Sequence, residues 1–351
     1  MIENLTDKRI ALIGGAGFIG HNLALALKKR GAYVGVIDGL EVNNLLAFSS
    51  TGNEIPNRNL YLRIIQDRLD LLRRADIPLY VQDARDYGAL NHLINKIQPN
   101  VIVHLAAVAH ADRSNKNPYS TFDHSLRTLE NALDNSKNQN NTRNRVNHFI
   151  YFSSSMVYGN FSNGFVTEDT VCYPLGIYGA LKYAGEKLVI GYHQVFDLPY
   201  TIIRPSALYG PGCVSRRVGQ IFIENALQDL EIIVSGDGSD QLDFTYIDDL
   251  IQGIIKVIEN KNSRNQIFNL THGQSRSIKE MISIIKEHFP RAKISHAERD
   301  KLMPSRGTLS VDKAKKLLNY QPEYPLEKGF VEYIQWYRKL FNENNLLGKR
   351  G

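Results

Sequence analysis

Short and almost continuously apolar segments alternate with longer segments of helical periodicity along the first two hundred residues. The segments that are typical of strands are "KRIALIGG", "AYVGVIDG", "PLYVQDARD", "NVIVHLAAVAH", "HFIYFSSSMVYG" and "PYTIIRPSALYG". Strands without regular polar positions are buried on both faces, as in a parallel sheet covered by helices. The pattern therefore predicts an α/β fold with a doubly wound parallel sheet. Functional residues are expected at the carboxyl ends of its strands.

Two stretches depart from this alternation. Residues 40–79 are long for a connection between strands and contain the amphipathic run "LYLRIIQDRLDLLRR", which predicts an additional helix. From about Ser206 the alternation loosens, and glycine and proline become frequent. We therefore expect a first domain over 1–205, to which a segment near 243–270 returns, and a smaller α/β substrate-binding lobe over 206–351.

The composition is that of an ordinary globular protein. Of the 351 residues, 43% are hydrophobic and 22% are charged, and no apolar run is long enough to span a membrane. The two cysteines give no disulfide framework and suit a reducing compartment. We therefore expect a cytoplasmic protein with no membrane partner.

The formal charge of +6 raises the possibility of nucleic-acid binding. However, the basic residues are scattered among acidic ones, and the sequence has neither an aromatic-basic cluster nor the spacing of a metal finger. We expect no nucleic-acid partner and no metal site, and a basic surface that helps to attract a small anionic substrate.

A glycine-rich turn joins the first strand to the first helix. "IALIGGAGFIG" places Gly14, Gly17 and Gly20 where they allow a tight turn, close approach of the backbone to a pyrophosphate, and packing of the helix on the strand. Asp38 ends the second strand, where a carboxylate can accept hydrogen bonds from ribose hydroxyls and repels a 2′-phosphate. This arrangement predicts binding of NAD rather than NADP.

"PLGIYGALKYAGEKL" contains Tyr178 four positions before Lys182, so both side chains lie on one face of a helix. The spacing alone is common on surface helices. Combined in this order with the glycine turn, "HLAA" and "SSSMVYG", it makes the chain resemble the extended short-chain dehydrogenase/reductases, in particular the NAD-dependent nucleotide-sugar epimerase/dehydratase family. The resemblance runs from about residue 8 to residue 337 and implies a Rossmann domain with a C-terminal substrate lobe.

The resemblance implies a catalytic set of Ser154, Tyr178 and Lys182. Tyr178 would remove a proton from a sugar hydroxyl while NAD accepts hydride from the same carbon. The ammonium of Lys182 and the positive nicotinamide ring would favour the phenolate, whose ordinary pKa is about 10. Ser154 would hydrogen-bond the reacting hydroxyl and Tyr178.

The resemblance also implies the residues that bind NAD and the state of assembly. Tyr178 and Lys182 would contact the cofactor, and Asp83 with Ala84 would contact its adenine. The remaining cofactor positions are Gly14, Gly17, Phe18, Ile19, Gly20, Asp38, Leu105, Ala106 and Ala107. Helices near 117–138 and 175–196 correspond to those of the family's dimer interface, so we expect a homodimer.

Ser155 and Met156 bear on the reaction type. Family members that resemble sugar 4,6-dehydratases carry an Asp-Glu pair here, and neither Ser155 nor Met156 can act as a general acid or base. The expectation is epimerisation, most simply at C4, through a transient 4-keto sugar. A dehydratase with other acid/base residues and a ketosugar reductase remain open. A non-catalytic NAD-sensing regulator is disfavoured because the catalytic set is retained.

The substrate side departs from the family pattern. Leu242 stands where an arginine usually grips the substrate diphosphate, and Ser206 replaces an asparagine that contacts it. The substrate-binding candidates, including four substitute cations, are Ser155, Met156, Ser206, Arg216, Arg217, Arg299 and Arg306. The expected substrate is a nucleotide-diphosphate sugar whose base and sugar the sequence does not identify.

Overall fold

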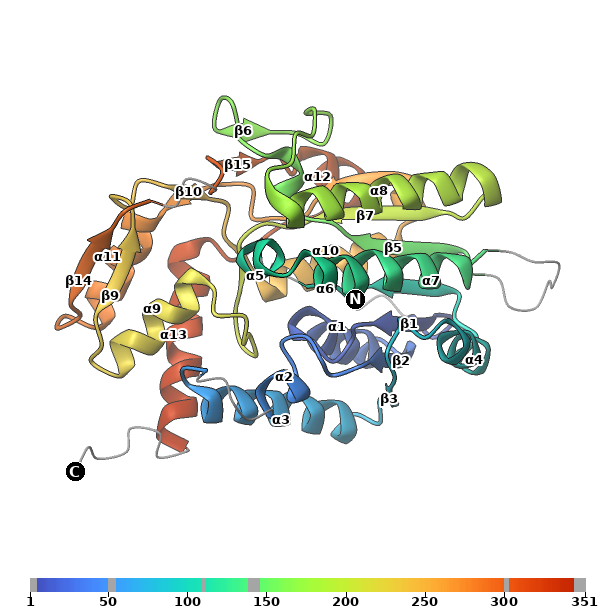
Figure 1. The fold of residues 1–351 in the computed structure, drawn as a ribbon, viewed down its shortest axis with the longest axis horizontal. Helices are drawn as coiled ribbons and strands as arrows, with labels where there is room; N and C mark the ends of the chain where they lie inside the picture. Colours follow the sequence, from blue (N-terminus) through green and yellow to red (C-terminus); the bar gives the residue numbers. More distant parts are fainter. Residues whose placement is uncertain (1–4, 50–54, 109–110, 138–145, 300–302, 344–351) are drawn as a thin grey trace.

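A computed structural model of the chain describes residues 5–49, 55–108, 111–137, 146–299 and 303–343. Its centre is a seven-stranded parallel sheet in the order β12-β7-β5-β4-β1-β2-β3 (Figure 1). The strands are β1 (Arg9–Ile13), β2 (Tyr33–Asp38), β3 (Leu79–Val81), β4 (Val101–His104), β5 (His148–Phe152), β7 (Tyr200–Arg204) and β12 (Gln266–Asn269). The predicted doubly wound α/β fold is confirmed.

Two hydrophobic cores cover the two faces of the sheet, because successive residues of a strand point to opposite sides. Ile10 and Leu12 pack in one core, and Ala11 and Ile13 pack in the other. Helices α1 (Phe18–Lys29), α3 (Arg58–Arg74) and α10 (Ile247–Glu259) cover the first face. Helices α4 (Tyr87–Ile97), α7 (Thr128–Asp134) and α8 (Gly176–Phe196) cover the second.

The long connection between β2 and β3 contains α2 (Leu45–Ser49) and α3, so the predicted amphipathic helix is confirmed. Its apolar face, which includes Leu60, Ile64 and Leu72, is buried in the core. The helix packs against α1 and α2. It also reaches the C-terminal lobe through a hydrogen bond of 2.6 Å from the Tyr61 hydroxyl to Glu224.

The C-terminal lobe packs α9 (Val218–Leu227), α11 (Ile278–His288) and α13 (Leu326–Glu343) against one another (Figure 1). Three pairs of short strands lie beside them: β8 (Leu208–Tyr209) with β11 (Thr245–Tyr246), β9 (Ile232–Ser235) with β14 (Ile294–Ala297), and β10 (Gln241–Leu242) with β13 (Arg276–Ser277). A fourth pair, β6 (Phe165–Val166) with β15 (Thr308–Leu309), lies apart from these helices (Figure 1). Strand β12 and helix α12 (Asp312–Leu318) return to the main sheet.

The remaining short helical turns lie at the carboxyl side of the sheet or in connections. They are α5 (Ala111–Lys116), α6 (Pro118–Phe122), the π-helical turn η1 (Asp123–Arg127), and the 3-10 turns η2 (Ser155–Tyr158) and η3 (Lys261–Ser263). None of the helices within the described ranges is long and apolar enough to cross a membrane. Cys172 and Cys213 are free thiols.

Candidate active site

A cleft opens at the carboxyl ends of β1, β2, β3 and β4, and we call it the dinucleotide cleft. It contains every cofactor position that was expected from the sequence apart from Tyr178 and Lys182. The residues that line it are Gly14, Gly17, Phe18, Ile19, Gly20, Ile37, Asp38, Gly39, Glu41, Val42, Asn43, Arg68, Gln82, Asp83, Ala84, Leu105, Ala106, Ala107, His124, Thr128, Leu208, Ser215 and Arg217.

The glycine turn has the geometry that a pyrophosphate needs. Gly14 has φ of +80°, and a Cβ there would lie 2.6 Å from the backbone nitrogen of Ala106. A Cβ on Gly20 would lie 2.4 Å from Cα of Gly15, so the first turn of α1 packs directly on the loop. No side chain among the described residues caps α1, which leaves its N-terminal N–H groups for a ligand. These residues fit the phosphates of a dinucleotide.

Asp38 is held at the end of β2 by the backbone of two neighbouring loops. Its carboxylate accepts hydrogen bonds from the N–H of Ala16 at 2.9 Å and of Leu40 at 2.8 Å. Burial raises the pKa of Asp38, and the two backbone hydrogen bonds act in the opposite direction. The carboxyl group is therefore fixed against the glycine turn, as a ribose-binding residue requires.

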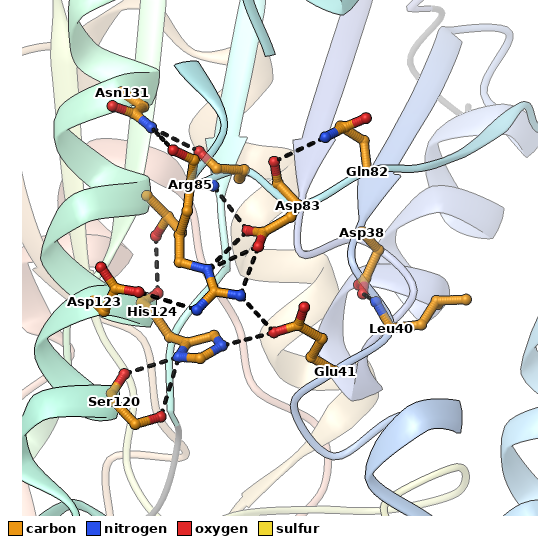
Figure 2. Close-up of polar contacts among 12 residues, drawn as sticks. Asp38, Leu40, Glu41, Gln82, Asp83, Arg85, Ser120, Asp123, His124 and Asn131 are labelled. Atoms are coloured by element: carbon orange, nitrogen blue, oxygen red, sulfur yellow. Dashed lines mark hydrogen bonds and ion pairs between the residues drawn. The ribbon is translucent and has the colours of Figure 1, made fainter. Parts of the chain in front are cut away.

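Figure 2 shows a polar cluster along the adjacent part of the cleft, which we call the Arg85 cluster: Glu41, Asp83, Arg85, Asp123 and His124. Arg85 donates to Asp83 at 2.8 Å, to Glu41 at 2.8 Å and to Asp123 at 3.0 Å. The Nε2 atom of His124 lies 2.9 Å from the same Glu41 carboxylate. The cluster joins the loop after β2, the end of β3 and η1.

The cluster also sets the ionisation of Asp83, a predicted adenine contact. Burial opposes ionisation of this carboxyl, but the hydrogen bonds from Arg85 outweigh it and lower the pKa of Asp83. The sequence gave no indication that Glu41, Arg85 and His124 lie together, because the contacting residues are far apart in the chain. Arg85 lies 44 residues from Glu41, and His124 lies 83 residues from Glu41.

Tyr178 enters the site from the first turn of α8. The start of this helix is fixed by Asn115 of α5, whose side-chain oxygen accepts from the Ile177 N–H at 3.1 Å. Burial raises the pKa of Tyr178, whereas the nearby charge of Arg217 and a hydrogen bond from Ser154 lower it. The structure therefore brings Ser154 and Tyr178 together, with a cation beside the phenol.

Lys182 lies one turn further along α8 and is buried. Its Nζ donates to the carbonyl of Phe152, the last residue of β5, at 2.6 Å. Burial lowers the pKa of Lys182 to about 8, and the carboxylate of Glu186 opposes this shift. The ammonium is thus held at the carboxyl end of β5, on the same strand end as Ser154.

A buried ion pair stands behind this lysine. Glu186 accepts from Arg204 at 2.7 and 2.9 Å and from the Ser153 hydroxyl at 2.5 Å. Arg204 also donates to Tyr158, whose hydroxyl donates to Asn269 of β12 at 2.8 Å. The network ties α8 to β5, β7 and β12, and so fixes the helix that carries Tyr178 and Lys182. Sequence reasoning missed both members of the ion pair.

The turn after β5 positions Ser154 and contains the two residues that bear on the reaction type. The Ser154 hydroxyl accepts from the Met156 N–H at 3.2 Å, which caps η2. Ser155 is buried and its N–H donates to the carbonyl of Pro205 at 2.9 Å. Met156 is only half-buried. Neither side chain ionises.

Three of the four expected cations, Arg217, Arg299 and Arg306, lie near enough for their charges to interact. Arg217 lines the dinucleotide cleft, and its charge acts on both Tyr178 and Arg306. Burial, reinforced by the charges of Arg217 and Arg299, lowers the pKa of Arg306 to about 10. The carboxylate of Asp240 acts in the opposite direction and pairs with Arg299 at 3.0 Å.

Arg216 lies elsewhere, although it is adjacent to Arg217 in the chain. Its guanidinium donates to the hydroxyl of Tyr61 on α3 at 3.0 Å and to the carbonyl of Pro56. Ser206 and Leu242 are both buried. Leu242 carries no charge, so it cannot replace the arginine that the family pattern has at this position. Among the residues that the structure describes, no three or more His, Cys, Asp or Glu side chains gather as metal ligands.

Comparison with known proteins gives independent evidence on what this cleft binds. The sequence profile of the NAD dependent epimerase/dehydratase family matches residues 10–271. UDP-glucuronate 4-epimerase from Thermodesulfobacterium geofontis is 29% identical over 92% of this chain and 94% of its own length. dTDP-glucose 4,6-dehydratase from Xanthomonas campestris pv. campestris is 27% identical over 92% of this chain and 91% of its own length.

A solved structure extends the likeness to three dimensions. The crystal structure of UDP-glucuronic acid 4-epimerase from Bacillus cereus, in complex with UDP-glucuronic acid and NAD, superposes with a TM-score of 0.82 and 26% sequence identity. The match covers 94% of this chain and 99% of that one. With the glycine turn and Asp38 in place, NAD is the cofactor. The chain belongs to the NAD-dependent epimerase/dehydratase family.

Proposed function

We propose that this protein is an epimerase that inverts C4 of a nucleotide-diphosphate sugar through a transient 4-keto sugar. The observation that carries the proposal is the strand end after β5. There Ser154 and the Tyr178–Lys182 pair meet, while the next two residues, Ser155 and Met156, carry no acid or base. Oxidation at C4 and return of the hydride to the opposite face of the ketone need no proton-transfer group beyond the first three residues. Elimination of water needs further proton-transfer groups.

The proposed roles follow from the contacts of each side chain. Tyr178 as phenolate takes the proton of the sugar hydroxyl and later returns it to the ketone oxygen. Ser154 donates a hydrogen bond that stabilises the phenolate, and Arg217 adds a positive charge to the same site. Lys182 and the glycine turn hold the cofactor. Bound NAD supplies the hydride acceptor at the sugar carbon and the donor that restores it.

The substrate we propose is a UDP-linked hexose or hexuronic acid. The relatives described above act on UDP-glucuronate or dTDP-glucose, and a structure that shares 25% identity binds UDP-glucose. We place the diphosphate beside Arg217, which lines the cleft, and Arg306, on which the charge of Arg217 acts. They would compensate for Leu242.

The test is product analysis by mass spectrometry and chromatography after the protein is incubated with UDP-, GDP-, CDP- and dTDP-sugars without added cofactor. The proposal predicts a new product of unchanged mass with at least one of the UDP-sugars. A product lighter by one water would identify a dehydratase and contradict the interpretation of Ser155 and Met156. A two-electron oxidation that requires added NAD would identify a dehydrogenase that does not recycle its cofactor.

We also propose that the protein is a homodimer that assembles through α6, α7 and α8. The support is the exposure of large apolar side chains on α6 and α8, including Tyr119, Phe122 and Leu188. Sedimentation analysis of the wild type and of a Leu188→Arg variant tests it. We expect a dimer in the first and a monomer in the second, and a monomeric wild type would refute the proposal.

A further inference from the structure

Arg68 is the one charged residue of the long 40–79 connection that the structure buries completely, among the residues described there. The side chain is 1% exposed and lies in α3, outside the strands and turns that usually define a dinucleotide site. It lines the dinucleotide cleft together with Gly14, Gly17 and Asp38. A buried arginine on the wall of a cofactor cleft requires a physical reason.

The hydrogen bonds of Arg68 within the described part of the chain satisfy only two of its three guanidinium nitrogens. Nε of Arg68 donates to the carbonyl of Gly212 at 2.6 Å, and Nη2 donates to the same oxygen. Nη1 is also buried, and it has no hydrogen-bond partner among the described residues. Because an unsatisfied buried N–H group is costly, and more so on a charged group, Nη1 needs an acceptor that the protein itself does not provide.

The electrostatic surroundings indicate that the acceptor is an anion. Arg68 forms no ion pair within the described residues, although the carboxylate of Asp38 is near enough to raise its pKa. Burial acts in the other direction and lowers the pKa of Arg68 to about 10, so the guanidinium keeps its charge at neutral pH. His21 contributes no charge, since burial, reinforced by Arg68, lowers its pKa to about 3. One positive charge therefore remains on this wall without a direct partner.

We propose that Arg68 is a cofactor-binding residue whose Nη1 donates to the pyrophosphate of NAD. Pyrophosphate is the anionic part of the cofactor, and the glycine turn that suits it lines the same cleft. Asp38 is a carboxylate acceptor and suits the neutral ribose hydroxyls instead. The inference rests on NAD as the cofactor and is independent of the sugar chemistry.

The contact also gives the 40–79 connection a function. Through the Gly212 carbonyl, Arg68 holds the loop that follows β8 and leads to Ser215 and Arg217, which line the cleft as well. A single guanidinium would thus bind the cofactor with one nitrogen and position the substrate-side loop with the other two.

The test measures nucleotide binding rather than turnover. The full-length chain, freed of bound nucleotide, is titrated calorimetrically with NAD, ADP and adenosine, as wild type and as Arg68→Met and Arg68→Lys. The matched control is Arg58→Met on the same helix, because Arg58 also donates to backbone carbonyls but lies outside the cleft. Thermal unfolding without nucleotide checks that each variant is folded.

We expect Arg68→Met to weaken the binding of NAD and of ADP at least about tenfold and to change the affinity for adenosine by no more than about twofold. Arg68→Lys keeps the charge and should lose less affinity for NAD and ADP than Arg68→Met. This variant allows the test even if the methionine variant does not fold. Unchanged affinity for NAD in a folded variant would overturn the proposal. An equal loss for adenosine would also overturn it, because the contact would then be to the nucleoside.

Discussion

At the scale of single residues, Tyr178 decides whether the site is catalytic. We expect Tyr178→Phe to bind NAD as the wild type does, because the ring remains and the cofactor contacts of the glycine turn are untouched. Turnover should fall by about a hundred- to ten-thousand-fold, since that is the usual contribution of a positioned general base. Nucleotide content and rate of epimer formation measure the two effects. Full activity in the variant would refute the mechanism.

Arg217 should influence the pH at which Tyr178 loses its proton. Its charge stabilises the phenolate and lowers the pKa of Tyr178, against the effect of burial. Removing the charge in Arg217→Gln therefore raises that pKa and moves the rise of kcat/KM to higher pH. The profile is recorded from about pH 6 to about pH 10. Arg216→Gln is the control, because Arg216 is the neighbour of Arg217 in the chain but donates to Tyr61 and Pro56. An unmoved profile in Arg217→Gln would contradict this role.

The difference between Arg216 and Arg217 shows what the sequence can predict about a site. The glycine turn and the Tyr178–Lys182 pair were predictable because each is set by neighbours within one turn or one helix. Asp38 was predictable because it ends β2, which pairs in parallel with β1 beside the glycine turn. The two arginines occupy an irregular segment, and Arg216 has φ of +50°, so their directions depend on the packing of distant elements. Both were equal candidates in the sequence, and only Arg217 lines the cleft.

At the scale of elements, α3 is bound to the C-terminal lobe through one buried carboxylate. Glu224 accepts from Asn57 and Tyr61 at the start of α3, from Gln220 in α9 and from Tyr337 in α13, at 2.6–2.8 Å. The periodicity of α3 predicted that the helix exists. Its partners lie more than 100 residues away, and periodicity carries no information about them.

Tyr61→Phe tests this connection. The variant leaves the ring in place and removes two hydrogen bonds of the hydroxyl, one donated to the buried Glu224 carboxylate and one accepted from Arg216. The free energy of unfolding should therefore fall by about 1.5–3 kcal/mol. Chemical denaturation measures it. Tyr173→Phe is the control, because that ring is 76% exposed and lies outside the proposed dimer interface, so its change should have no measurable effect. Equal stability of the Tyr61 variant and wild type would show that α3 is not held through Glu224.

The Arg85 cluster should slow the release of NAD. Glu41 takes hydrogen bonds from both Arg85 and His124 across segments that border the cleft. Glu41→Ala removes both contacts, so we expect NAD to dissociate several-fold faster, as followed by exchange against labelled NAD. Glu130→Ala breaks an exposed ion pair with Arg127 outside the cleft and should leave the rate unchanged. Equal rates in the two variants would argue against the cluster's role.

At the scale of the whole molecule, three buried histidines limit stability in acid. Burial lowers the pKa of His21, His104 and His148 to about 3, whereas the unfolded chain binds these protons near its ordinary pKa of about 6.5. The unfolded state therefore binds more protons, and the free energy of unfolding falls as the pH drops from about 6.5 towards about 3.

Asp243 opposes this trend over part of the range. Burial raises its pKa to about 6, so below that pH the folded state holds a proton that the unfolded state releases until about pH 4. Urea denaturation at several pH values measures the net slope. His148→Gln should make the slope shallower by up to one proton. An identical slope would show that His148 takes up no proton on unfolding.

The Arg85 cluster has a consequence for the proposed reaction as a whole. It joins three segments beside the cleft that are distant in sequence, and a cofactor retained there would stay through many cycles. Epimerisation returns to each sugar the electrons that it gave up, so a retained cofactor never has to be reoxidised by a second enzyme. The ratio of the two sugars would then be set by their relative stabilities and supply, and would not respond to the redox state of the cell.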